Sequence, residues 1–482
     1  MLPLRSGYPP TVDWADNVKG EAMTQPTPVT VGKVRRIFQG VGLGLFCLGT
    51  IGLLGFQSAA AQNPVELSEL ETLYPSLDAL YIDLHKNPEL SLREERTAAK
   101  MASRLRDLGF EVTEHVGGNG VVGVLRNGQG PTVLVRTDMD ALPVKENTGL
   151  NYASTVVVKS DAGESVPVAH ACGHDIHMAS WVGAATLLAH SKDRWHGTLV
   201  FVGQPAEEVL QGADAMVRDG LLTRFPRPDF ALAIHDTNLL PAGQIGVIAG
   251  PAFAASNAVD ITFYGKGGHG ALPHLTIDPL LIAARTVVTL QTIVAREVNP
   301  FDPAVVTVGT FRAGTKRNVI ADEAKIELTV RSYKPEVQKH LLESIERIAK
   351  AEAAAAGAPR EPSVVVDAKE ASEVVFNDPA LATRLESALR RAVGDANVVP
   401  GMPTPGSEDF GVFGRVAGAP SVLLRVGAIE PGEFAAAKAA GKTLPGPHSP
   451  LFAPDREPTI RTGVAAFTVS VLDLLGRPAQ GH

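Results

Sequence analysis

The sequence predicts an α/β protein whose mostly parallel sheet is interrupted by an inserted α+β module. β-rich apolar runs alternate with segments of helical periodicity between residues 62 and 254, which is typical of a parallel sheet with helices on both faces. Between residues 255 and 367 the order changes to β-α-β-β-α-β, and the alternating pattern returns from 368 to 482. A chain of 482 residues is long enough for about two or three domains.

The first part of the α/β domain, residues 62–254, alternates helices and strands. Apolar residues recur at helical spacing from Val65 to Leu108, with a break at Asn87-Pro88. Asn127-Gly128, between two β-rich runs, indicates a hairpin or a tight turn. In chain order we expect strands at 121–125 and 132–135, a helix at 175–191, a strand at 198–202, a helix at 211–222 and a strand at 230–234.

The inserted module, residues 255–367, has the element order of a ferredoxin-like split βαβ fold. Its length of about 110 residues is typical of a domain. We expect strands at 259–263, 305–311, 325–331 and 363–367, with helices at 277–296 and 335–356. A helix at 379–393, a strand at 421–426 and a helix at 458–475 then complete the α/β domain within residues 368–482.

Residues 1–61 are predicted to be a secretory signal peptide. Lys33, Arg35 and Arg36 precede an uncharged stretch from Ile37 to Phe56, and a run of small residues ending at Ala61 follows. We therefore expect a secreted or periplasmic protein. The apolar stretch of roughly 20 residues could also span a bilayer, so an uncleaved membrane anchor is the alternative, and Met23 is a second candidate start.

Composition excludes several classes of protein. Hydrophobic residues make up 45% of the chain and charged residues 20%, a balance that excludes an intrinsically disordered protein. Two cysteines, Cys47 and Cys172, are too few for a disulfide scaffold, and Cys47 would leave with the signal peptide. The net charge of −8 and the absence of a long basic run argue against nucleic acid as a partner.

Acids and histidines follow three successive predicted strands of the α/β domain. These residues are Asp138 and Asp140, Glu207 and Glu208, and His235 and Asp236. Because open α/β sheets bind ligands beyond the carboxyl ends of their strands, these side chains predict one site. Cys172 and His174 lie directly before the helix at 175–191, and His448 lies in a proline-rich loop near the C-terminus.

Thiol, imidazole and carboxylate groups together are typical of a Zn²⁺, Mn²⁺ or Co²⁺ site, whereas Ca²⁺ and Mg²⁺ prefer oxygen shells. The candidate groups outnumber the ligands of one tetrahedral ion, so two divalent ions are expected. Structural alternatives exist for single residues: Asp140 could be a helix cap, and tandem Glu207-Glu208 a solvated pair. We interpret His170 and His177 as structural.

Two other enzyme classes are disfavoured. Gly265-Lys-Gly-Gly-His-Gly270 fits the G-x-G-x-x-G pattern of dinucleotide-binding proteins, but no acid for a ribose follows about 20 residues later. No G-x-S-x-G sequence occurs, which argues against a serine hydrolase of that type.

Seven short motifs occur in a characteristic order. They are LHKNPELS from Leu84, DMDALP from Asp138, HACGHDIH from His170, GQPAEE from Gly203, GGHGALPH from Gly267, GSEDF from Gly406 and HSP from His448. From about residue 70 onward this order resembles the M20 metallopeptidase family. The combination of Asp138 and Cys172 resembles its amidohydrolase branch, which cleaves N-acyl amino acids such as hippurate and auxin conjugates.

The resemblance implies a metallohydrolase catalytic domain with a dinuclear metal site. Its implied ligands are Cys172, His174, Glu208, His235 and His448. Glu207 matches the catalytic base, and Asp140 matches the acid that orients a metal-bound histidine. The implied reaction is hydrolysis of the amide bond by a metal-activated water, which releases a carboxylic acid and an amino acid.

The resemblance also implies that the inserted module is a lid through which two subunits form a homodimer. His269 matches a lid histidine that reaches the partner's active site, and Asn318 and Arg331 match lid groups that contact the substrate. The segment 151–167 is longer than in most members, and we expect it to shape the mouth of the pocket. Two alternatives stay open: an exopeptidase (dipeptidase or carboxypeptidase) on the same metal site, and a non-catalytic periplasmic binding protein.

Overall fold

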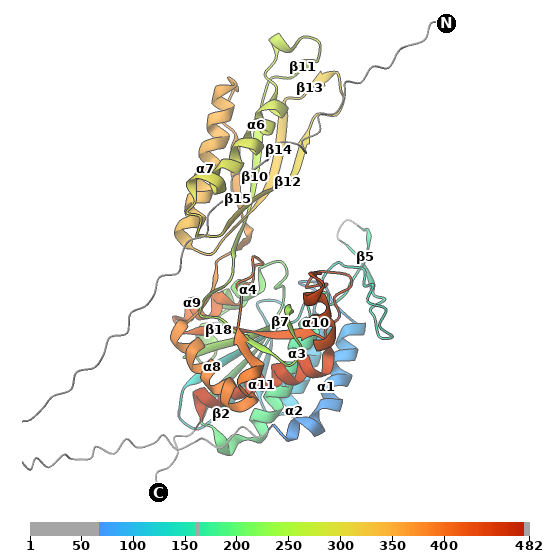
Figure 1. Ribbon diagram of the computed structural model, residues 1–482, viewed down its shortest axis with the longest axis vertical. Coiled ribbons are helices and arrows are strands. Elements are labelled where there is room, and N and C mark those ends of the chain that lie inside the picture. Colours follow the sequence, from blue (N-terminus) through green and yellow to red (C-terminus); the bar gives the residue numbers. More distant parts are fainter. Residues whose placement is uncertain (1–66, 161–162, 477–482) are drawn as a thin grey trace, which may run out of the picture. The chain divides into compact units, whose positions relative to one another are not determined.

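The structure, a computed structural model, describes residues 67–160 and 163–476 (Figure 1). The predicted signal peptide, its membrane-anchor alternative and the candidate start at Met23 lie outside the described residues. Within them, an eight-stranded mixed sheet and a separate four-stranded antiparallel sheet are formed. The predicted fold class, an α/β domain interrupted by an α+β module, is therefore confirmed.

The large sheet has a parallel centre that is flanked on each side by a strand running antiparallel to it. Its strands, in spatial order, are β1 (Glu111–Val116), β2 (Gly120–Asn127), β6 (Gly197–Gln204), β3 (Thr132–Asp138), β7 (Phe230–Pro241), β18 (Ser421–Ile429), β8 (Ile245–Val247) and β17 (Val398–Pro400). The strands β6, β3, β7 and β18 run parallel, so their carboxyl ends meet at one edge of the sheet.

Helices cover both faces of this sheet because successive side chains of a strand point to opposite sides. One face packs against α1 (Glu69–Lys86), α2 (Glu95–Asp107), α3 (His174–His190), α8 (Pro379–Val393) and α11 (Arg456–Leu475). The other packs against α4 (Gly212–Arg218), α5 (Leu221–Arg224) and α9 (Gly411–Ala417). In β3, Val133 and Val135 belong to the first core and Leu134 to the second. The helix α11 is long and apolar, and 78% of its most apolar stretch is buried inside the protein, so it is a core helix.

A hairpin or a tight turn was predicted at Asn127-Gly128, and the hairpin is wrong, because the short loop 128–131 connects two strands, β2 and β3, that are not paired with each other. Strand β6 lies between β2 and β3, pairing antiparallel with the former and parallel with the latter. Both apolar runs are buried on their two faces, so their pattern did not specify which strand would be the neighbour. The predicted helix at 211–222 is divided into α4 and α5 at Gly220, whose φ of +93° is left-handed.

The inserted module has the topology expected from its sequence. Its elements are β10 (Ala255–Tyr264), α6 (Pro279–Thr292) with the π-helical turn η3 (Ile293–Glu297), β12 (Ala304–Ala313), β14 (Glu323–Ser332), α7 (Pro335–Ala355) and β15 (Ser363–Ser372). The strand order β12-β14-β10-β15 is entirely antiparallel, and α6 and α7 share one apolar core with the sheet. Residue 367, the predicted end of the module, falls within β15.

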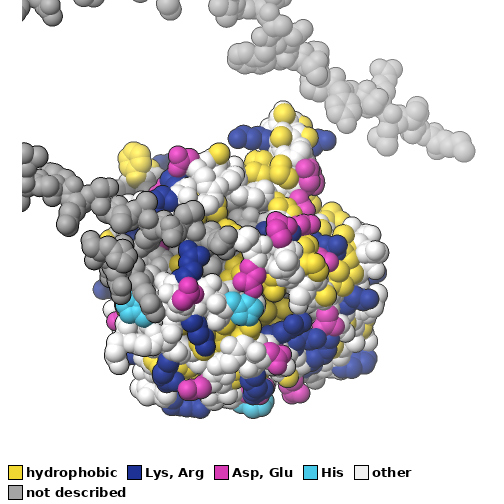
Figure 2. Space-filling view, turned by 90° about the horizontal axis from the view of Figure 1, so that it is seen from below, with side chains coloured by type: hydrophobic (Ala, Val, Ile, Leu, Met, Phe, Trp, Pro, Cys, Tyr) yellow, Lys and Arg dark blue, Asp and Glu magenta, His cyan; other side chains and the backbone are white. Residues whose placement is uncertain are grey.

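Short elements complete the described residues. They are the strand pairs β4 (Val157–Lys159) with β5 (Ser165–Pro167), β9 (Gly250–Phe253) with β16 (Val375–Asn377), and β11 (Gly268–His269) with β13 (Val319–Ile320), the helix α10 (Pro431–Ala439), and the 3₁₀ turns η1 (Lys192–Arg194), η2 (Pro273–Leu275) and η4 (Asp395–Asn397). The face drawn in Figure 2 carries basic and acidic side chains interspersed with apolar ones, without a broad field of one sign.

Candidate metal centre

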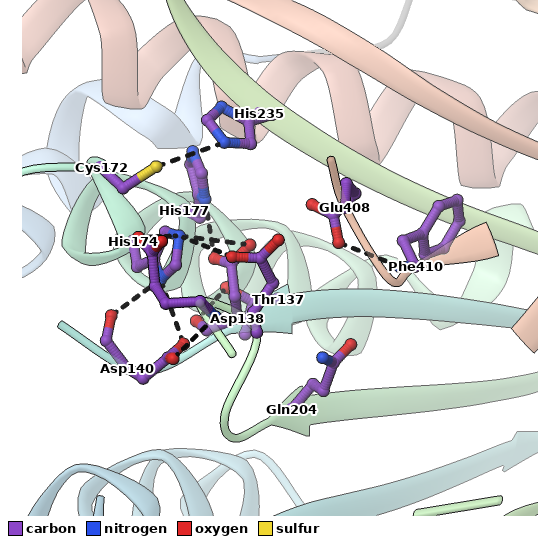
Figure 3. A network of polar contacts seen from close by, with 12 residues as sticks. Thr137, Asp138, Asp140, Cys172, His174, His177, Gln204, His235, Glu408 and Phe410 are labelled. Carbon is purple, nitrogen blue, oxygen red and sulfur yellow. Dashed lines mark hydrogen bonds and ion pairs between the residues drawn. The ribbon is translucent and has the colours of Figure 1, made fainter. Parts of the chain in front are cut away.

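A cluster of polar side chains lies where the parallel strands end (Figure 3). Strand β3 ends in Asp138, and the loop after β6 carries Glu207 and Glu208. His235 belongs to the neighbouring strand β7, and His174 is the first residue of α3. Groups that are far apart in the sequence therefore meet because parallel strands share one edge.

The five predicted metal ligands are brought together. They form overlapping groups, and the candidate ligand atoms within each group lie within 4.8 Å of one another. The sulfur of Cys172 lies 3.6 Å from Nε2 of His235, and Nε2 of His448 lies 3.2 Å from an oxygen of Glu208. Nε2 of His174 lies 3.7 Å from an oxygen of Glu208. Such separations suit atoms that share an ion about 2 Å from each of them.

The two buried histidines of the cluster have fixed tautomers. Nδ1 of His174 donates to the carbonyl oxygen of Asp140 at 2.7 Å, and Nδ1 of His235 donates to that of Asp236 at 2.7 Å. Because a carbonyl oxygen only accepts, each Nδ1 carries the proton and each Nε2 keeps a lone pair for a metal. Nε2 of His174 and Oε1 of Glu208 are buried without a hydrogen-bond partner, so these residues fit a cation site.

The electrostatics of Cys172 also fit a cation. Burial, and then the charges of Glu208 and Glu207, raise the pKa of the Cys172 thiol well above its ordinary value. A thiolate is stable in such acidic surroundings only where positive charge offsets the carboxylates. Divalent ions bound by the same side chains supply that charge.

Backbone strain is concentrated in the loops that carry the cluster. Ala206, Leu210 and His448 have φ angles of +53°, +55° and +70°, which non-glycine residues rarely adopt. Gly173 has a φ of +78°, and a Cβ atom there would lie 2.1 Å from Oδ2 of Asp236. Only glycine fits between Cys172 and His174, because any side chain would collide with that carboxylate.

Glu207 and Glu208 have different surroundings despite being adjacent. Glu207 is 4% exposed, and burial together with the carboxylates of Glu408 and Glu208 raises its pKa well above the ordinary value. Glu208 has its backbone N–H held by Oδ2 of Asp140 at 3.0 Å, and its side chain lies beside His448. Glu207 is therefore suited to carry a proton, and Glu208 to bind a cation.

Asp140 lies in the position expected of an orienting acid. Its Oδ1 lies 3.4 Å from Nδ1 of His174, and its backbone carbonyl accepts the hydrogen bond from the same nitrogen. Oδ2 accepts from the Ser91 hydroxyl at 2.6 Å as well as from the Glu208 amide. Asp140 thus connects the histidine, the loop of the glutamates and the LHKNPELS motif.

A buried arginine that the sequence analysis missed supports the cluster. Arg136, fully buried in β3, donates to Asp138 at 2.6 Å, to Gln204 at 2.8 Å and to Glu408 at 2.8 Å. Asp138 in turn accepts from Nδ1 of His177 at 2.7 Å. The signal in the sequence was a charged residue inside an apolar β-rich run, since a buried charge requires partners. The GSEDF motif acquires a role here, because its Glu408 is a partner of Arg136.

Glu94 is a second residue that the sequence analysis missed. It is fully buried at the start of α2 and accepts hydrogen bonds from the backbone N–H groups of Ala206 and Leu92, both at 2.8 Å. One carboxylate thus connects the LHKNPELS loop with the strained loop that precedes Glu207. Its pKa is raised by burial and by the charge of Asp140.

His170 and His177, both interpreted as structural, are buried near the cluster. His177 lies between two acids: Nδ1 faces Asp138, and the backbone N–H of Asp236 donates to Nε2 at 3.0 Å. Candidate metal groupings include His177 together with Asp138 and His174, or with His235 and Asp236. His170 is 3% exposed and has no hydrogen-bond partner on either ring nitrogen.

A cavity of about 1020 Å³ opens beside the cluster. Its described lining includes the ligand candidates Cys172, Glu208, His235 and His448, the apolar residues Val209, Leu210 and Phe253, and polar groups of the inserted module. Arg331, from β14, lines the cavity and donates to the hydroxyl of Ser407. Arg425, from β18, also lines it beside His235.

Two residues that were predicted to contact the substrate, His269 and Asn318, do not line the cavity of their own chain. His269 and Asn318 lie together on the β11–β13 sheet, where the Gly270 amide donates to the Asn318 carbonyl at 2.9 Å. Both are exposed, and neither is among the described residues that line the cavity. The segment 151–167 forms the β4–β5 pair, and none of its described residues lines the cavity either.

A mostly parallel sheet with thiol, imidazole and carboxylate groups at its strand ends defines the class of metal-dependent hydrolases. Residues 134–440 match the sequence profile of peptidase family M20/M25/M40. The hippurate hydrolase of Campylobacter jejuni is 35% identical over 349 residues, covering 72% of this chain and 87% of the relative. The thermostable carboxypeptidase 2 of Saccharolobus solfataricus is 36% identical over 334 residues, covering 68% and 80%.

The solved structure of the Bacillus subtilis YXEP protein, a dinuclear metal binding peptidase of the M20 family, is similar in fold. It aligns with a TM-score of 0.67 and 29% identity, covering 84% of this chain and all of that one. The present chain belongs to peptidase family M20/M25/M40 and is a hydrolase of the dinuclear metal type. The resemblance of its motifs to this family is thereby confirmed.

Proposed function

We propose that the protein is a metal-dependent amidohydrolase that cleaves the amide bond of N-acyl amino acids. The observation that carries this proposal is the apolar wall formed by Val209, Leu210 and Phe253, which borders the metal cluster inside the cavity. The Phe253 ring lies 5.6 Å from the His235 ring. The carbon chain or ring of an acyl group matches such a wall, whereas the free ammonium group of a peptide would lose its hydration there.

Cys172, His174, Glu208, His235 and His448 would hold two divalent ions, with Zn²⁺, Mn²⁺ and Co²⁺ as the candidates. When bound, such ions lower the pKa of water and polarise a carbonyl group. Asp140 and the Asp236 carbonyl keep the two imidazoles in the tautomer and orientation that this requires. Arg136 fixes Asp138 and Glu408 around them.

Glu207 would be the general base. Its raised pKa suits a group that removes a proton from the attacking water and later gives this proton to the leaving nitrogen. Arg331, held by Ser407 at the cavity wall, would bind the carboxylate of the amino acid product.

The inserted module would act as a lid and as the homodimer interface. In α6, Leu281 is 58% and Val288 71% exposed, and β12 is an unpaired edge strand among the described residues of its sheet. An exposed apolar helix beside an open edge strand favours association with a second copy. In such a dimer, His269 and Asn318 would complete the partner's active site, with His269 stabilising the oxyanion.

Export by a cleaved signal peptide, residues 1–61, belongs to the same proposal, because Lys33 to Ala61 has the basic, apolar and small-residue order of a signal. N-terminal sequencing of protein recovered from the periplasm or medium tests it. A new N-terminus at Gln62 is expected, whereas an intact terminus in the membrane fraction supports the anchor alternative.

A substrate panel tests the activity. Metal-loaded enzyme should hydrolyse N-acetyl and N-benzoyl amino acids with higher kcat/KM than free-amine dipeptides of the same C-terminal residue. The reverse preference would favour an exopeptidase, in line with the carboxypeptidase among the relatives. Protein that binds no metal and cleaves neither class would support a binding protein.

A further inference from the structure

Arg425 is a buried arginine beside the metal cluster, and it is the one charged residue of its strand. It lies in β18, whose residues Ser421–Ile429 are all buried, and it is the register partner of His235 on β7. Its guanidinium lies 4.9 Å from the centre of the Phe253 ring. Arg425, Phe253 and His235 all line the same cavity.

The hydrogen bonding of Arg425 is incomplete. Nη2 donates to the carbonyl oxygen of Asp236 at 3.0 Å, but Nη1 is buried and has no hydrogen-bond partner. Arg136, by contrast, has carboxylate or amide oxygens on all three of its nitrogens. Burial lowers the pKa of Arg425 to about 10, and the charges of Asp236, Cys172 and Glu408 oppose this shift only in part.

A buried cation with an unused donor destabilises the fold, so packing does not explain its presence. A leucine or methionine would fill the strand position without this penalty. Local features that oppose stability are expected where function requires them. The position of Arg425, beside a metal-ligand candidate in a substrate-sized cavity, indicates the function.

We propose that Arg425 binds a second carboxylate of the substrate, so that the preferred substrates are N-acyl amino acids carrying an acidic group besides the α-carboxylate. Arg331 and Arg425 are the two arginines among the described lining residues, and a dianionic amide matches both. The inference rests on the proposed function. The additional carboxylate could belong to the amino-acid side chain or to the acyl group. Two pairs of substrates, one for each position, distinguish these cases.

The first experiment compares isosteric substrates. N-acetylglutamate is paired with N-acetylglutamine, and N-succinylalanine with its succinamoyl counterpart. In the wild-type enzyme at least one acid should exceed its amide in kcat/KM by about ten- to hundredfold, mainly through KM. Arg425→Met should remove most of that ratio, and Arg425→Lys should restore part of it. The control Arg384→Leu, at an arginine paired with Asp473, should keep the wild-type ratio.

Metal content and melting temperature are measured on the same variants. Arg425→Met should bind the wild-type amount of metal and melt at or above the wild-type temperature. The proposal is overturned if neither acid is preferred, if the preference survives Arg425→Met, or if the variant loses its metal or unfolds, since Arg425 would then serve the metal site or the fold.

The second experiment measures binding without turnover. Calorimetric titration of metal-loaded protein with glutarate and with glutaramate should show glutarate binding about ten- to hundredfold more tightly, and Arg425→Met should reduce this preference at least tenfold. An unchanged preference in the variant contradicts the role of Arg425. If no N-acyl amino acid reacts, the proposed activity is wrong. The binding experiment would still test the role of Arg425, because it does not require turnover.

Discussion

At the scale of single residues, chemically identical side chains are suited to different roles because their surroundings differ. Glu207 and Glu208 are neighbours in sequence, yet burial beside Glu408 raises the pKa of Glu207, while Asp140 and His448 hold Glu208 toward the cation site. The same separation applies to His174 and His235, in which Nδ1 donates to a carbonyl oxygen and Nε2 is left for a ligand. Roles therefore depend on the hydrogen-bond partner more than on residue type.

The roles of Glu207 and Cys172 can be separated by mutation. Glu207→Gln should keep the wild-type metal content but lose about 10²–10⁴-fold in kcat, because the amide cannot accept the proton. Cys172→Ala should lose metal and activity together, since it removes a candidate ligand from the cluster. Metal analysis of both purified variants beside their rates distinguishes the two effects. An active Glu207→Gln enzyme would refute its assignment as the base.

A buried imidazole supplies a pH-dependent part of the stability. Nδ1 of His85 lies 2.6 Å from Asp175, and Nε2 lies 3.1 Å from Glu146. Burial opposes protonation, but the two carboxylates outweigh it and raise the pKa of His85 from 6.5 to about 10. Because the folded pKa is the higher one, this contribution is complete below pH 6.5 and is lost as the pH rises through 10.

His85→Gln should therefore reduce the free energy of unfolding by about 3 kcal/mol at pH 6, and by clearly less at pH 10. Denaturant unfolding at the two pH values measures this change. His190→Gln, at an exposed histidine at the end of α3, serves as the matched control and should show a small difference at both. A penalty for His85→Gln that stays constant with pH would contradict the charged pair.

At the scale of elements, the loop that carries the glutamates is held by the residues directly before α2. Glu94, the residue before this helix, accepts the Ala206 amide, and Ser91 donates to Asp140, which accepts the Glu208 amide. These bonds offset the strain of the left-handed residue Ala206. The motif around residue 90 therefore acts on the candidate metal ligands indirectly, by setting the geometry of the loop that carries them.

Replacing Glu94 tests this support. Glu94→Gln replaces the carboxylate by a neutral amide, whose oxygen accepts less strongly from the N–H groups of Leu92 and Ala206 and whose NH2 group meets the Nδ2 donor of Asn119. It should therefore lower kcat by about tenfold or more and the stability by about 1–3 kcal/mol. Steady-state kinetics and thermal unfolding of metal-loaded protein give both values. The exposed neighbour Glu95 provides the control, Glu95→Gln, which should resemble the wild type. A Glu94→Gln enzyme with wild-type kcat would show that the loop does not depend on it.

At the scale of the whole molecule, activity is proposed to require two chains. The candidate lid residues His269 and Asn318 do not line the cavity of their own chain, whereas Arg331 does. The exposed apolar side chains of α6 beside the open edge of β12 offer a surface for the second copy. An active site completed across the interface couples catalysis to association.

Complementation between inactive subunits tests this arrangement. His269→Ala and Glu207→Gln homodimers should each be nearly inactive. Refolded or co-expressed together, half of the dimers would be mixed and each would contain one intact site, so about a quarter of wild-type activity should return. Absence of any recovery would indicate that His269 acts within its own chain or not at all.

Association itself can be perturbed on the exposed face of the lid. Val288→Asp places a charge on a side chain that is 71% exposed and should shift the protein toward monomers with reduced kcat/KM. Light scattering over a concentration series measures the mass. Lys339→Asp, an exposed position on α7, is the control and should keep the wild-type oligomeric state. A fully active Val288→Asp monomer would argue against the shared site.

The sequence by itself determined most of the longer elements and the chemical types of the site. Periodicity located the central strands and the long helices of both domains but did not predict β1, β8, β17, α9 or α10. The β-α-β-β-α-β order predicted the topology of the module, because local patterns follow from which face of each element is buried. Cys172, His174, Glu207, Glu208, His235 and His448 stood out as candidate site residues at strand ends or in glycine- and proline-rich loops, and the resemblance to the family implied which of them bind metal and which acts as the base.

Only the tertiary structure decided which strands are neighbours and which polar groups are partners. The insertion of β6 between β2 and β3 could not be derived from two equally apolar runs. The partners of Arg136, the support given by Glu94 and the unused nitrogen of Arg425 depend on contacts between distant segments. Such contacts leave no local period in the chain, because hydrogen bonds between buried groups are set by how whole elements pack.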